Sequence, residues 1–128
     1  MPSYTIKNMM DIDDATPADM PQVEGRFARS HIDSRELGVS HFRYGPGFRS
    51  PMGHSHREQE EVYVVTSGSG RVKLDDEVRD VRQWDVVRVA PEVVRAFEAT
   101  DDGLELIVVG SARPEEGDGV PVPGWWTD

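Results

Sequence analysis

The sequence predicts an all-β fold with antiparallel strands, and three observations support this prediction. Runs rich in Val, Ile, Tyr and Phe recur at intervals of about 8–12 residues, the usual strand spacing of sandwiches and barrels. Glycine, proline and paired aspartates separate these runs and mark turns. No segment repeats its apolar residues with the period of a helix.

The predicted elements begin with an arm. Residues 1–24 are acidic and contain Pro17 and Pro21, which break helices, so we expect them to pack against the body or a neighbour. Beyond this arm the apolar period becomes two, as in a strand. The expected strands cover residues 26–32, 39–44, 61–66, 71–74, 77–81, 85–90, 93–99 and 104–110.

Turns and chain length define the domain organisation. Residues 67–70, Ser-Gly-Ser-Gly, are expected to form the turn of a hairpin, and Asp75-Asp76 the next turn. A chain of 128 residues is large enough for one core. We therefore expect a single domain, with a barrel over residues 25–112 between the arm and a tail over residues 113–128.

This tail is too rich in proline and glycine for regular structure to be expected. Trp125 and Trp126 lie near its end, and adjacent tryptophans at a terminus usually dock because each has a large apolar surface. Two interpretations are open. The pair seals the end of this chain's own core, or it forms a lid on a pocket or a dimer contact.

Charge and composition exclude several classes of partner. The net charge of −10 repels phosphate backbones and anionic lipids, so neither nucleic acid nor a membrane is expected as a partner. The absence of cysteine excludes disulfides and Cys-ligated zinc or iron–sulfur sites. The N-terminus lacks the apolar segment of a signal peptide, and no apolar run approaches the ~20 residues of a membrane span. A cytoplasmic location is therefore expected.

His54 and His56 are candidate metal ligands. On a strand, residues two apart share a face, so both imidazoles can reach one ion. Glu61 has the wrong parity to join them on one straight strand, so the polar residues 57–60 must form a loop or bulge. Two histidines and one carboxylate, with positions left open, are the ligand set of non-haem iron sites and also serve Mn, Ni, Co or Zn. Glu60 is an alternative ligand in a shifted register.

The same stretch resembles the first motif of the cupin family. That motif runs here as His54-Ser-His56, four residues, Glu61, six residues and Gly68. Residues 46–53 are similar to the Gly/Pro-rich lead-in of the family, and residues 83–97 are similar to its second motif. The resemblance covers roughly residues 39–110. It implies a small double-stranded β-helix (a jelly-roll cupin barrel), a central pocket with a divalent transition metal such as Fe, Mn, Ni or Zn, and a homodimer formed through N-terminal strands.

The fourth metal ligand of the resembled family is a histidine, and Arg95 occupies that position here. Arginine stays protonated and is no ligand. A divalent ion and a guanidinium about 6 Å apart repel by roughly 5 kcal/mol at an effective dielectric constant of about 20. Two interpretations stay open. Arg95 pairs with Glu61 and no metal is held tightly, or the metal binds through both histidines and Glu61 while Arg95 receives an anionic substrate.

Three further residues are candidates for contact with a ligand. Tyr63 and Phe97 share the parity of Glu61 and Arg95, so they are expected inside the barrel, where core packing and ligand contact are compatible. His41 lies in an expected strand that the resemblance places near the pocket, and a side chain facing solvent is the alternative.

Three hypotheses for the function follow. The first is a metal-dependent enzyme, such as a dioxygenase, isomerase or lyase, that acts on a small anionic molecule. The second is a binding protein with the same pocket, no tight metal and no turnover. The third is a protein-interaction scaffold that uses the acidic arm or the tryptophan tail. A barrel of this kind does not by itself choose among them.

Overall fold

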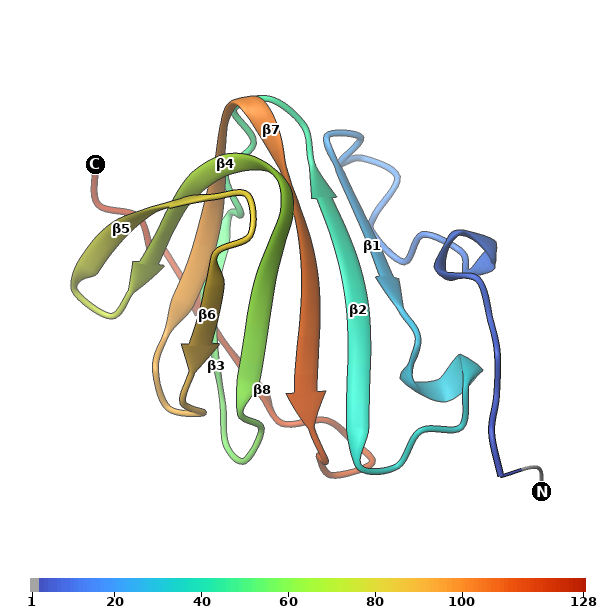
Figure 1. The fold of residues 1–128 in the computed structure, drawn as a ribbon. Helices are drawn as coiled ribbons and strands as arrows, with labels where there is room; N and C mark the ends of the chain where they lie inside the picture. Colours follow the sequence, from blue (N-terminus) through green and yellow to red (C-terminus); the bar gives the residue numbers. More distant parts are fainter. Residues whose placement is uncertain (1–2) are drawn as a thin grey trace.

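The chain forms one antiparallel sheet that curls on itself (Figure 1). The computed structural model describes residues 3–128. Its eight strands are β1 (Val23–Phe27), β2 (Leu37–Tyr44), β3 (Met52–His56), β4 (Glu61–Leu74), β5 (Glu77–Arg82), β6 (Val86–Val89), β7 (Arg95–Ser111) and β8 (Gly119–Pro123). Two short 3-10 helices, η1 (Met9–Asp11) and η2 (Arg29–His31), flank β1. The all-β, antiparallel fold predicted from the sequence is confirmed.

The long strand β7 organises the sheet. It pairs with β4 on one side, and on its other side with β2 along its second half and with β3 at Arg95. The strand order is β1-β2-β7-β3-β8, so β1 and β8 lie at its two ends, and β4 also pairs with β5 and β6. This topology makes Arg95 the direct partner of His54 on β3.

Two pairs of predicted strands are in fact single long, bent strands. The expected turn at residues 67–70 lies inside β4, whose register against β7 shifts twice between Val65 and Gly70. Such bulges bend a strand without ending it. Gly68 permits the bend because its φ is +77°, and because any side chain there would collide with the carbonyl of Gly103. In the same way, the single strand β7 includes most of the expected strand 93–99 and all of the expected strand 104–110.

The first strand begins earlier than the sequence predicts. Of the expected strand 26–32, only the first residues belong to β1, and the rest turn into η2. The N–H group of Ala28 still donates to the carbonyl of Val39, but the N–H group of His31 already donates back to Ala28, which closes a turn. Residues 75–76 form the predicted turn between β4 and β5.

The prediction that the tail has no regular structure is wrong for β8, which pairs along the whole of β3. Two prolines obscured this strand because proline lacks the N–H group that a sheet requires. Pro121 and Pro123 occupy alternate positions of a strand at the end of the sheet. Both can therefore direct the missing donor away from β3, as edge strands allow.

The tryptophan pair docks onto this chain's own barrel, as the first interpretation predicts. Trp126 donates from Nε1 to the carbonyl of Ser50 at 2.9 Å, and the guanidinium of Arg49 lies 4.3 Å from its ring centroid. Trp125 covers Gly53, where a Cβ atom would come within 2.7 Å of the indole. The glycine of β3 thus leaves the space that the indole fills.

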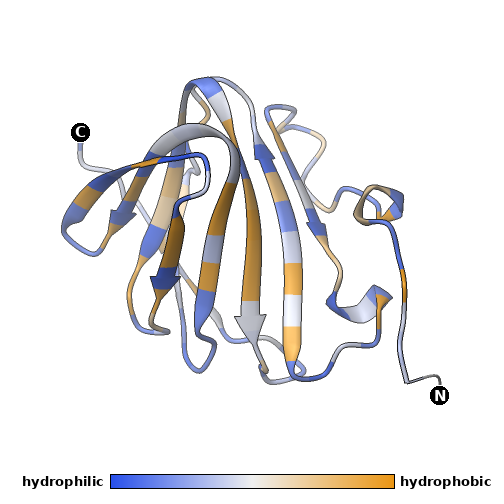
Figure 2. Cartoon of the chain, viewed as in Figure 1, coloured by the Kyte–Doolittle hydropathy of each residue, from blue (hydrophilic) through white to orange (hydrophobic). Residues whose placement is uncertain are grey.

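The core lies between the inward faces of the strands. Apolar residues follow one another over residues 106–109 of β7, whereas apolar and polar residues alternate along β2 (Figure 2). The buried cluster consists of Tyr63, Val65, Val72, Val81, Val89, Phe97, Ala99, Leu104, Leu106 and Val108. Within residues 3–128, no helix has the length and apolar character needed to cross a membrane.

Candidate metal centre

The side chains of His54, His56 and Glu61 converge inside the barrel. β3 carries both histidines and β4 begins at Glu61, while residues 57–60 between them are not part of a strand, as the parity argument predicts. Oε1 of Glu61 lies 3.2 Å from Nε2 of His56 and 3.8 Å from Nε2 of His54. One ligand atom from each residue lies within 4.8 Å of the other two, which is close enough for all three to share an ion.

The alternative ligand Glu60 points elsewhere. Its side chain is exposed and accepts a hydrogen bond from Nη1 of Arg88 at 2.8 Å on the outer surface. Glu61, in contrast, lines both cavities that adjoin the histidines. The structure therefore excludes the shifted register.

His56 is oriented by Asp118, which directly precedes β8. Oδ1 of Asp118 lies 2.9 Å from Nδ1 of His56, and its other oxygen accepts the N–H groups of Glu58 and Gln59. Burial raises the pKa of Asp118, but these donors outweigh burial and hold the pKa below its usual range. Because an ionised carboxylate only accepts, Nδ1 of His56 carries the proton and Nε2 presents its lone pair to the cluster.

Sequence reasoning missed Asp118 and its partner Gln59. The amide of Gln59 donates to Oδ1 of Asp118 at 3.1 Å across 59 residues of sequence. No motif spacing connects two positions so far apart. The only local signal is that Asp118 precedes a Val-Pro-Val-Pro run. In the sequence alone, this segment is typical of an ordinary polar tail.

Arg95 is completely buried, at 0% exposure, and holds the carboxylate of the cluster. Its Nη2 donates to Oε1 of Glu61 at 3.0 Å, and its Nε donates to the hydroxyl of Tyr63 at 3.2 Å. Its Nη1 donates to the carbonyl oxygens of Val93 and Pro91, at 2.7 and 3.3 Å. The guanidinium therefore directs most of its donors to groups of the protein itself.

Glu61 stays ionised in this environment. Burial raises its pKa, but the two imidazoles and the hydroxyl of Tyr63, which donates to Oε1 at 2.7 Å, lower the pKa well below its ordinary value. Tyr63 shows the opposite effect, because burial and the neighbouring Glu61 raise its pKa well above 10.0. Tyr63 is thus a neutral hydrogen-bond donor beside an anionic ligand candidate.

The cluster fits a divalent ion held by three protein ligands. Nε2 of His56 is buried, and in this tautomer it has no donor partner within residues 3–128, because its neighbour 3.2 Å away is Oε1 of the ionised Glu61. Tyr63 and Arg95 both donate to Oε1 of Glu61, the oxygen that lies nearest the two histidines, and thereby fix the carboxylate beside them. Arg95 pairs with His54 in the sheet, and a guanidinium is no metal ligand, so it adds none to the three ligand candidates of the cluster.

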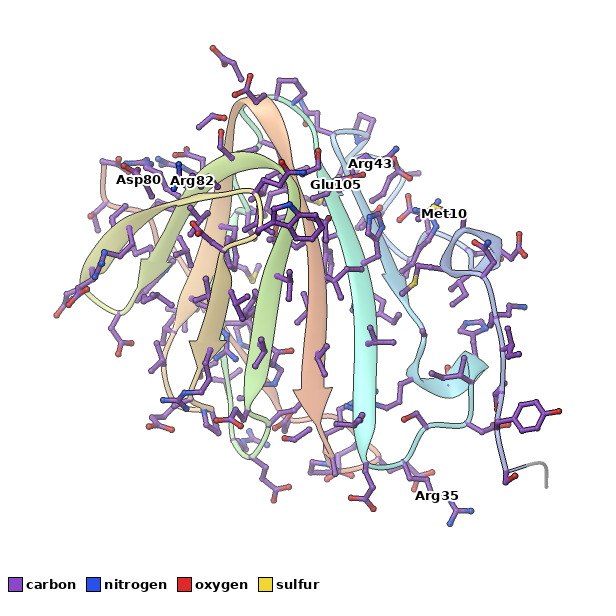
Figure 3. All side chains as sticks on the ribbon, viewed as in Figure 1. Met10, Arg35, Arg43, Asp80, Arg82 and Glu105 are labelled. Carbon is purple, nitrogen blue, oxygen red and sulfur yellow. The ribbon has the colours of Figure 1, made fainter. Side chains whose placement is uncertain are left out.

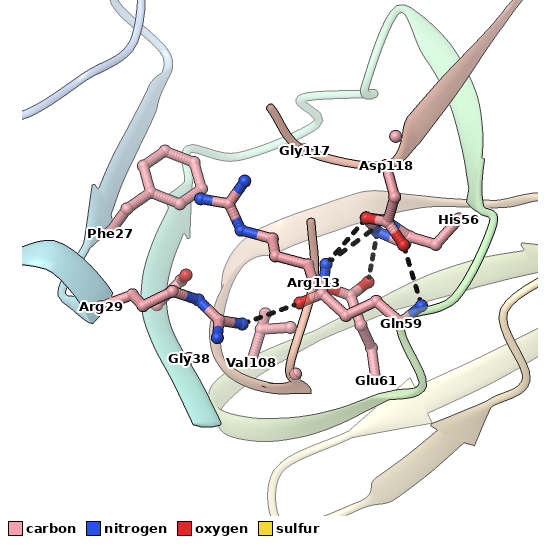
Figure 4. A pocket seen from close by; sticks show the side chains of 13 residues that line it. Phe27, Arg29, Gly38, His56, Gln59, Glu61, Val108, Arg113, Gly117 and Asp118 are labelled. Carbon is pink, nitrogen blue, oxygen red and sulfur yellow. Dashed lines mark hydrogen bonds and ion pairs between the residues drawn. The ribbon is translucent and has the colours of Figure 1, made fainter. Parts of the chain in front are cut away.

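Two cavities adjoin the cluster. The first has a volume of about 340 Å³ and lies between the inward faces of the strands, where Phe42, Tyr44, Tyr63 and Phe97 form its aromatic wall. The second has a volume of about 350 Å³ and extends from His56 and Glu61 toward Arg29 and Arg113 (Figure 4). Both volumes lie at the lower end of the ~300–1,000 Å³ typical of small-molecule sites.

Of the predicted ligand-contact residues, Tyr63 and Phe97 line the inner cavity, with ring centroids 4.9 Å apart. His41 lines neither cavity beside the cluster. It shares a face of β2 with Arg43, whose outward side chain pairs with Glu105 at 2.6 Å (Figure 3). His41 itself lies 3.8 Å from Glu105 and is nearly buried, which lowers its pKa. The placement of His41 near the pocket is therefore wrong, and so is the alternative that it faces solvent.

Comparison with known proteins identifies the barrel. A family model described as a cupin domain matches residues 40–110, which is more than half of the chain. No curated protein matches the sequence. A cupin protein from Bacteroides fragilis superimposes with a TM-score of 0.73 and 21% identity over 90% of this chain and 89% of its own. KdgF from Halomonas sp. superimposes with a TM-score of 0.69 and 15% identity over 91% of this chain and 98% of its own.

A larger protein also contains this fold. Oxalate decarboxylase from Bacillus subtilis superimposes with a TM-score of 0.73 and 21% identity over 91% of this chain, which spans only 32% of the decarboxylase. At such low identities, these structural similarities show the fold alone. That fold is a jelly-roll barrel, as the resemblance of the first motif implies. The family match covers His54, His56, Glu61 and Arg95 together. The chain belongs to the cupin family.

Proposed function

We propose that this cupin binds a first-row divalent metal ion through His54, His56 and Glu61, and a small organic anion beside it. The state of His56 carries the proposal. Its Nδ1–H group donates to Asp118, and its buried Nε2 therefore turns a lone pair toward Oε1 of Glu61, 3.2 Å away, which cannot donate to it. Leaving a buried polar atom unpaired costs about 1–3 kcal/mol, and a metal ion would satisfy it.

The other residues hold this site rather than ligate the ion. Tyr63 and Arg95 fix the carboxylate of Glu61, and Asp118 fixes the ring of His56. A bound ion would supply a Lewis acid with coordination positions open to a ligand oxygen. This arrangement supports oxygenase, isomerase or lyase chemistry on a small anion. The name of one structural neighbour, oxalate decarboxylase, describes action on a small carboxylate and agrees with this class.

A second candidate is a binding protein without a tight metal. The observation that favours it is the ion pair between Arg95 and Glu61, which already neutralises the carboxylate that a metal would need. In that case the two cavities would bind the small molecule alone, and His54 and His56 would be polar groups of the pocket wall.

Metal content distinguishes the two candidates. The untagged protein, purified without chelators, should contain close to one equivalent of a divalent metal by elemental analysis. Calorimetry of the chelator-treated protein with Mn²⁺, Fe²⁺, Ni²⁺ and Zn²⁺ should then detect binding that is lost in His54→Ala and His56→Ala. His31→Ala is the matched control, because His31 is exposed in η2 and lines neither cavity beside the cluster. Equal affinity in all four proteins would refute the proposal and favour the binding protein.

A further inference from the structure

Two guanidinium groups face the cavity of Figure 4 without an acidic partner. Arg29 and Arg113 line its outer part, away from His56 and Asp118 (Figure 4). Neither arginine forms an ion pair with any residue from 3 to 128. The chain does not lack carboxylates, since it has 24 acidic and 14 basic side chains. The two arginines therefore leave positive charge at the cavity of an acidic protein.

Arg29 is held rigidly in this position. Its Nη2 donates to the carbonyl of Ser111 at 2.7 Å and to the side-chain oxygen of Gln59 at 3.2 Å. The guanidinium lies against Gly38, where a Cβ atom would come within 2.5 Å of Nη2. Its Nε makes no hydrogen bond with the described residues. The group is thus fixed by neutral partners and keeps donors free for a ligand.

Arg113 is close enough to Arg29 to repel it. The side chain of Arg113 forms no hydrogen bond within the described residues and extends beside Phe27 (Figure 4). The pKa of Arg29 is lowered, first by burial and then by repulsion from Arg113, and Asp118 opposes this only in part. An anion between the two guanidiniums would replace this repulsion with two charge-assisted hydrogen bonds.

The carboxylates that line the same cavity are already engaged. Glu61 accepts hydrogen bonds from Tyr63 and Arg95. Asp118 contacts His56 and accepts two backbone N–H groups. If Glu61 is balanced by Arg95, then Asp118 offsets only one of the two outer arginines. Among the residues that line this cavity, one positive charge remains.

We propose that Arg29 and Arg113 together bind a carboxylate group of an organic ligand that extends through this cavity to the candidate metal centre. This inference rests on the proposed function and adds the chemical class of its ligand. The planar fork of arginine matches a carboxylate, and one singly charged carboxylate neutralises the remaining charge. Phe27 and Val108 provide apolar walls for the carbon atoms that follow.

Glutarate, a short dicarboxylate, is a suitable probe. Titration of the chelator-treated protein with glutarate should shift the side-chain Nε–H resonances of Arg29 and Arg113 in ¹H–¹⁵N spectra. Arg113→Gln should weaken glutarate binding roughly ten- to a hundredfold, the effect of losing a charged hydrogen bond. This variant leaves the fold intact because Arg113 has no internal hydrogen bond to lose. Arg29→Lys keeps the charge but lacks the fork, and should weaken glutarate binding as well.

Arg82→Gln provides the matched control. Arg82 is exposed on β5, remote from the cavity, and the substitution removes the same charge (Figure 3). Its affinity for glutarate should equal that of the parent. The proposal is overturned if Arg113→Gln and Arg29→Lys bind glutarate as the control does. Tighter binding of inorganic phosphate than of glutarate by the same pair would overturn the assignment to a carboxylate.

A parallel titration with Mn²⁺ alone separates this inference from the metal proposal. Arg113→Gln should bind Mn²⁺ no more weakly than the parent protein. Glutarate binding that depends on both arginines, in a protein that binds no Mn²⁺, would support the carboxylate subsite and refute the metal centre. If Mn²⁺ binds normally but glutarate binding does not depend on either arginine, the metal centre would be supported and the carboxylate subsite refuted.

Discussion

Asp118 and His56 are joined by a contact of 2.9 Å between Oδ1 and Nδ1, although 62 residues separate them in the sequence. The contact connects the C-terminal segment to the candidate metal centre. β8 starts immediately after Asp118 and pairs with β3, which carries both histidines. One segment therefore positions the strand and orients the imidazole.

The first prediction concerns this contact. Asp118→Asn keeps the size of the side chain but removes the charge that fixes the tautomer of His56. We expect divalent-metal affinity to fall about 10–100-fold, the usual effect of removing such a partner of a ligating histidine. Calorimetry with Zn²⁺ and Mn²⁺ measures the change. Asp76→Asn, in the exposed turn between β4 and β5, should bind metal as the parent does; equal losses in both variants would show a general charge effect instead.

The second prediction concerns pH. Burial lowers the pKa of His56, but Glu61 and Asp118 raise it more, so it lies above the ordinary 6.5. Protons therefore compete for Nε2 already above pH 6.5, and metal affinity should fall as the pH is lowered, by about tenfold per unit once one imidazole titrates. In Asp118→Asn the fall should begin at a lower pH. Calorimetry from pH 8 to pH 5.5 tests both statements, and a pH-independent affinity would argue against imidazole ligands.

The third prediction separates the two roles of the C-terminal segment. Truncation after Gly124 removes both tryptophans but keeps β8 and Asp118. It also deprives the buried amine of Lys73 of the carbonyl of Trp125, 2.6 Å away, and of the indole ring 4.2 Å away. Partial burial of two indoles stabilises by about 2–4 kcal/mol, so the melting temperature should fall by at least ~5 °C. Metal affinity should not change.

Truncation after Gly119 is the matched comparison. It removes nearly all of β8, the only strand that pairs along the length of β3 in the described chain. We expect a lower melting temperature still, together with weaker metal binding, because His54 and His56 lose the strand that holds them. A shorter protein that melts and binds metal like the full chain would reduce the tail to a passive tether.

The fourth prediction concerns assembly, and we propose a homodimer to which residues near 1–30 contribute. β1 lies at the end of the strand order, and such edges are commonly covered by pairing. Nearby, Tyr4 and Ile6 are 73% and 88% exposed, which leaves apolar surface for a partner. Light scattering at micromolar concentration should give twice the chain mass of 14.3 kDa. A mass of one chain would refute the dimer.

The local pattern of the sequence was sufficient to predict the fold class and the residues of the cluster. Period-two runs marked most strands, and the parity of Glu61 required the loop before it. Arg95 and Phe97 face inward as their parity indicates. These features depend on neighbours within a few residues, where spacing carries information.

The remaining features depend on long-range contacts that spacing does not encode. Residues 67–70 look like a hairpin turn, but pairing along the whole of β7 turns them into bulges in one strand. β8 is hidden by its prolines, and Asp118 reaches His56 only because β8 pairs with β3. His41 becomes buried through side chains from other strands, such as Glu105 on β7. Local propensity is a weak guide wherever such pairing decides the outcome.

The last prediction concerns Arg95, the residue on which the choice between metal centre and metal-free pocket depends. Arg95→His replaces a buried positive charge opposite His54 with a neutral ligand. The ion would gain a fourth protein ligand and lose a repulsion of several kcal/mol. Divalent-metal affinity should therefore rise at least ~10-fold, since each 1.4 kcal/mol is a factor of ten.

Arg95→Leu distinguishes the new ligand from the lost charge. It removes the guanidinium without adding a ligand, so metal affinity should rise less than in Arg95→His, while Glu61 loses its internal partner. If the two variants gain equally, the charge of Arg95 alone limits metal binding. If metal affinity rises in neither variant, the loss of Arg95 as the hydrogen-bond donor to Glu61 cancels the relief of repulsion. Glu61 would then need Arg95 to hold its carboxylate toward the histidines. Thermal unfolding of both metal-free variants measures how much the ion pair between Arg95 and Glu61 stabilises the barrel. A melting temperature equal to that of the parent would show that this buried ion pair does not stabilise it.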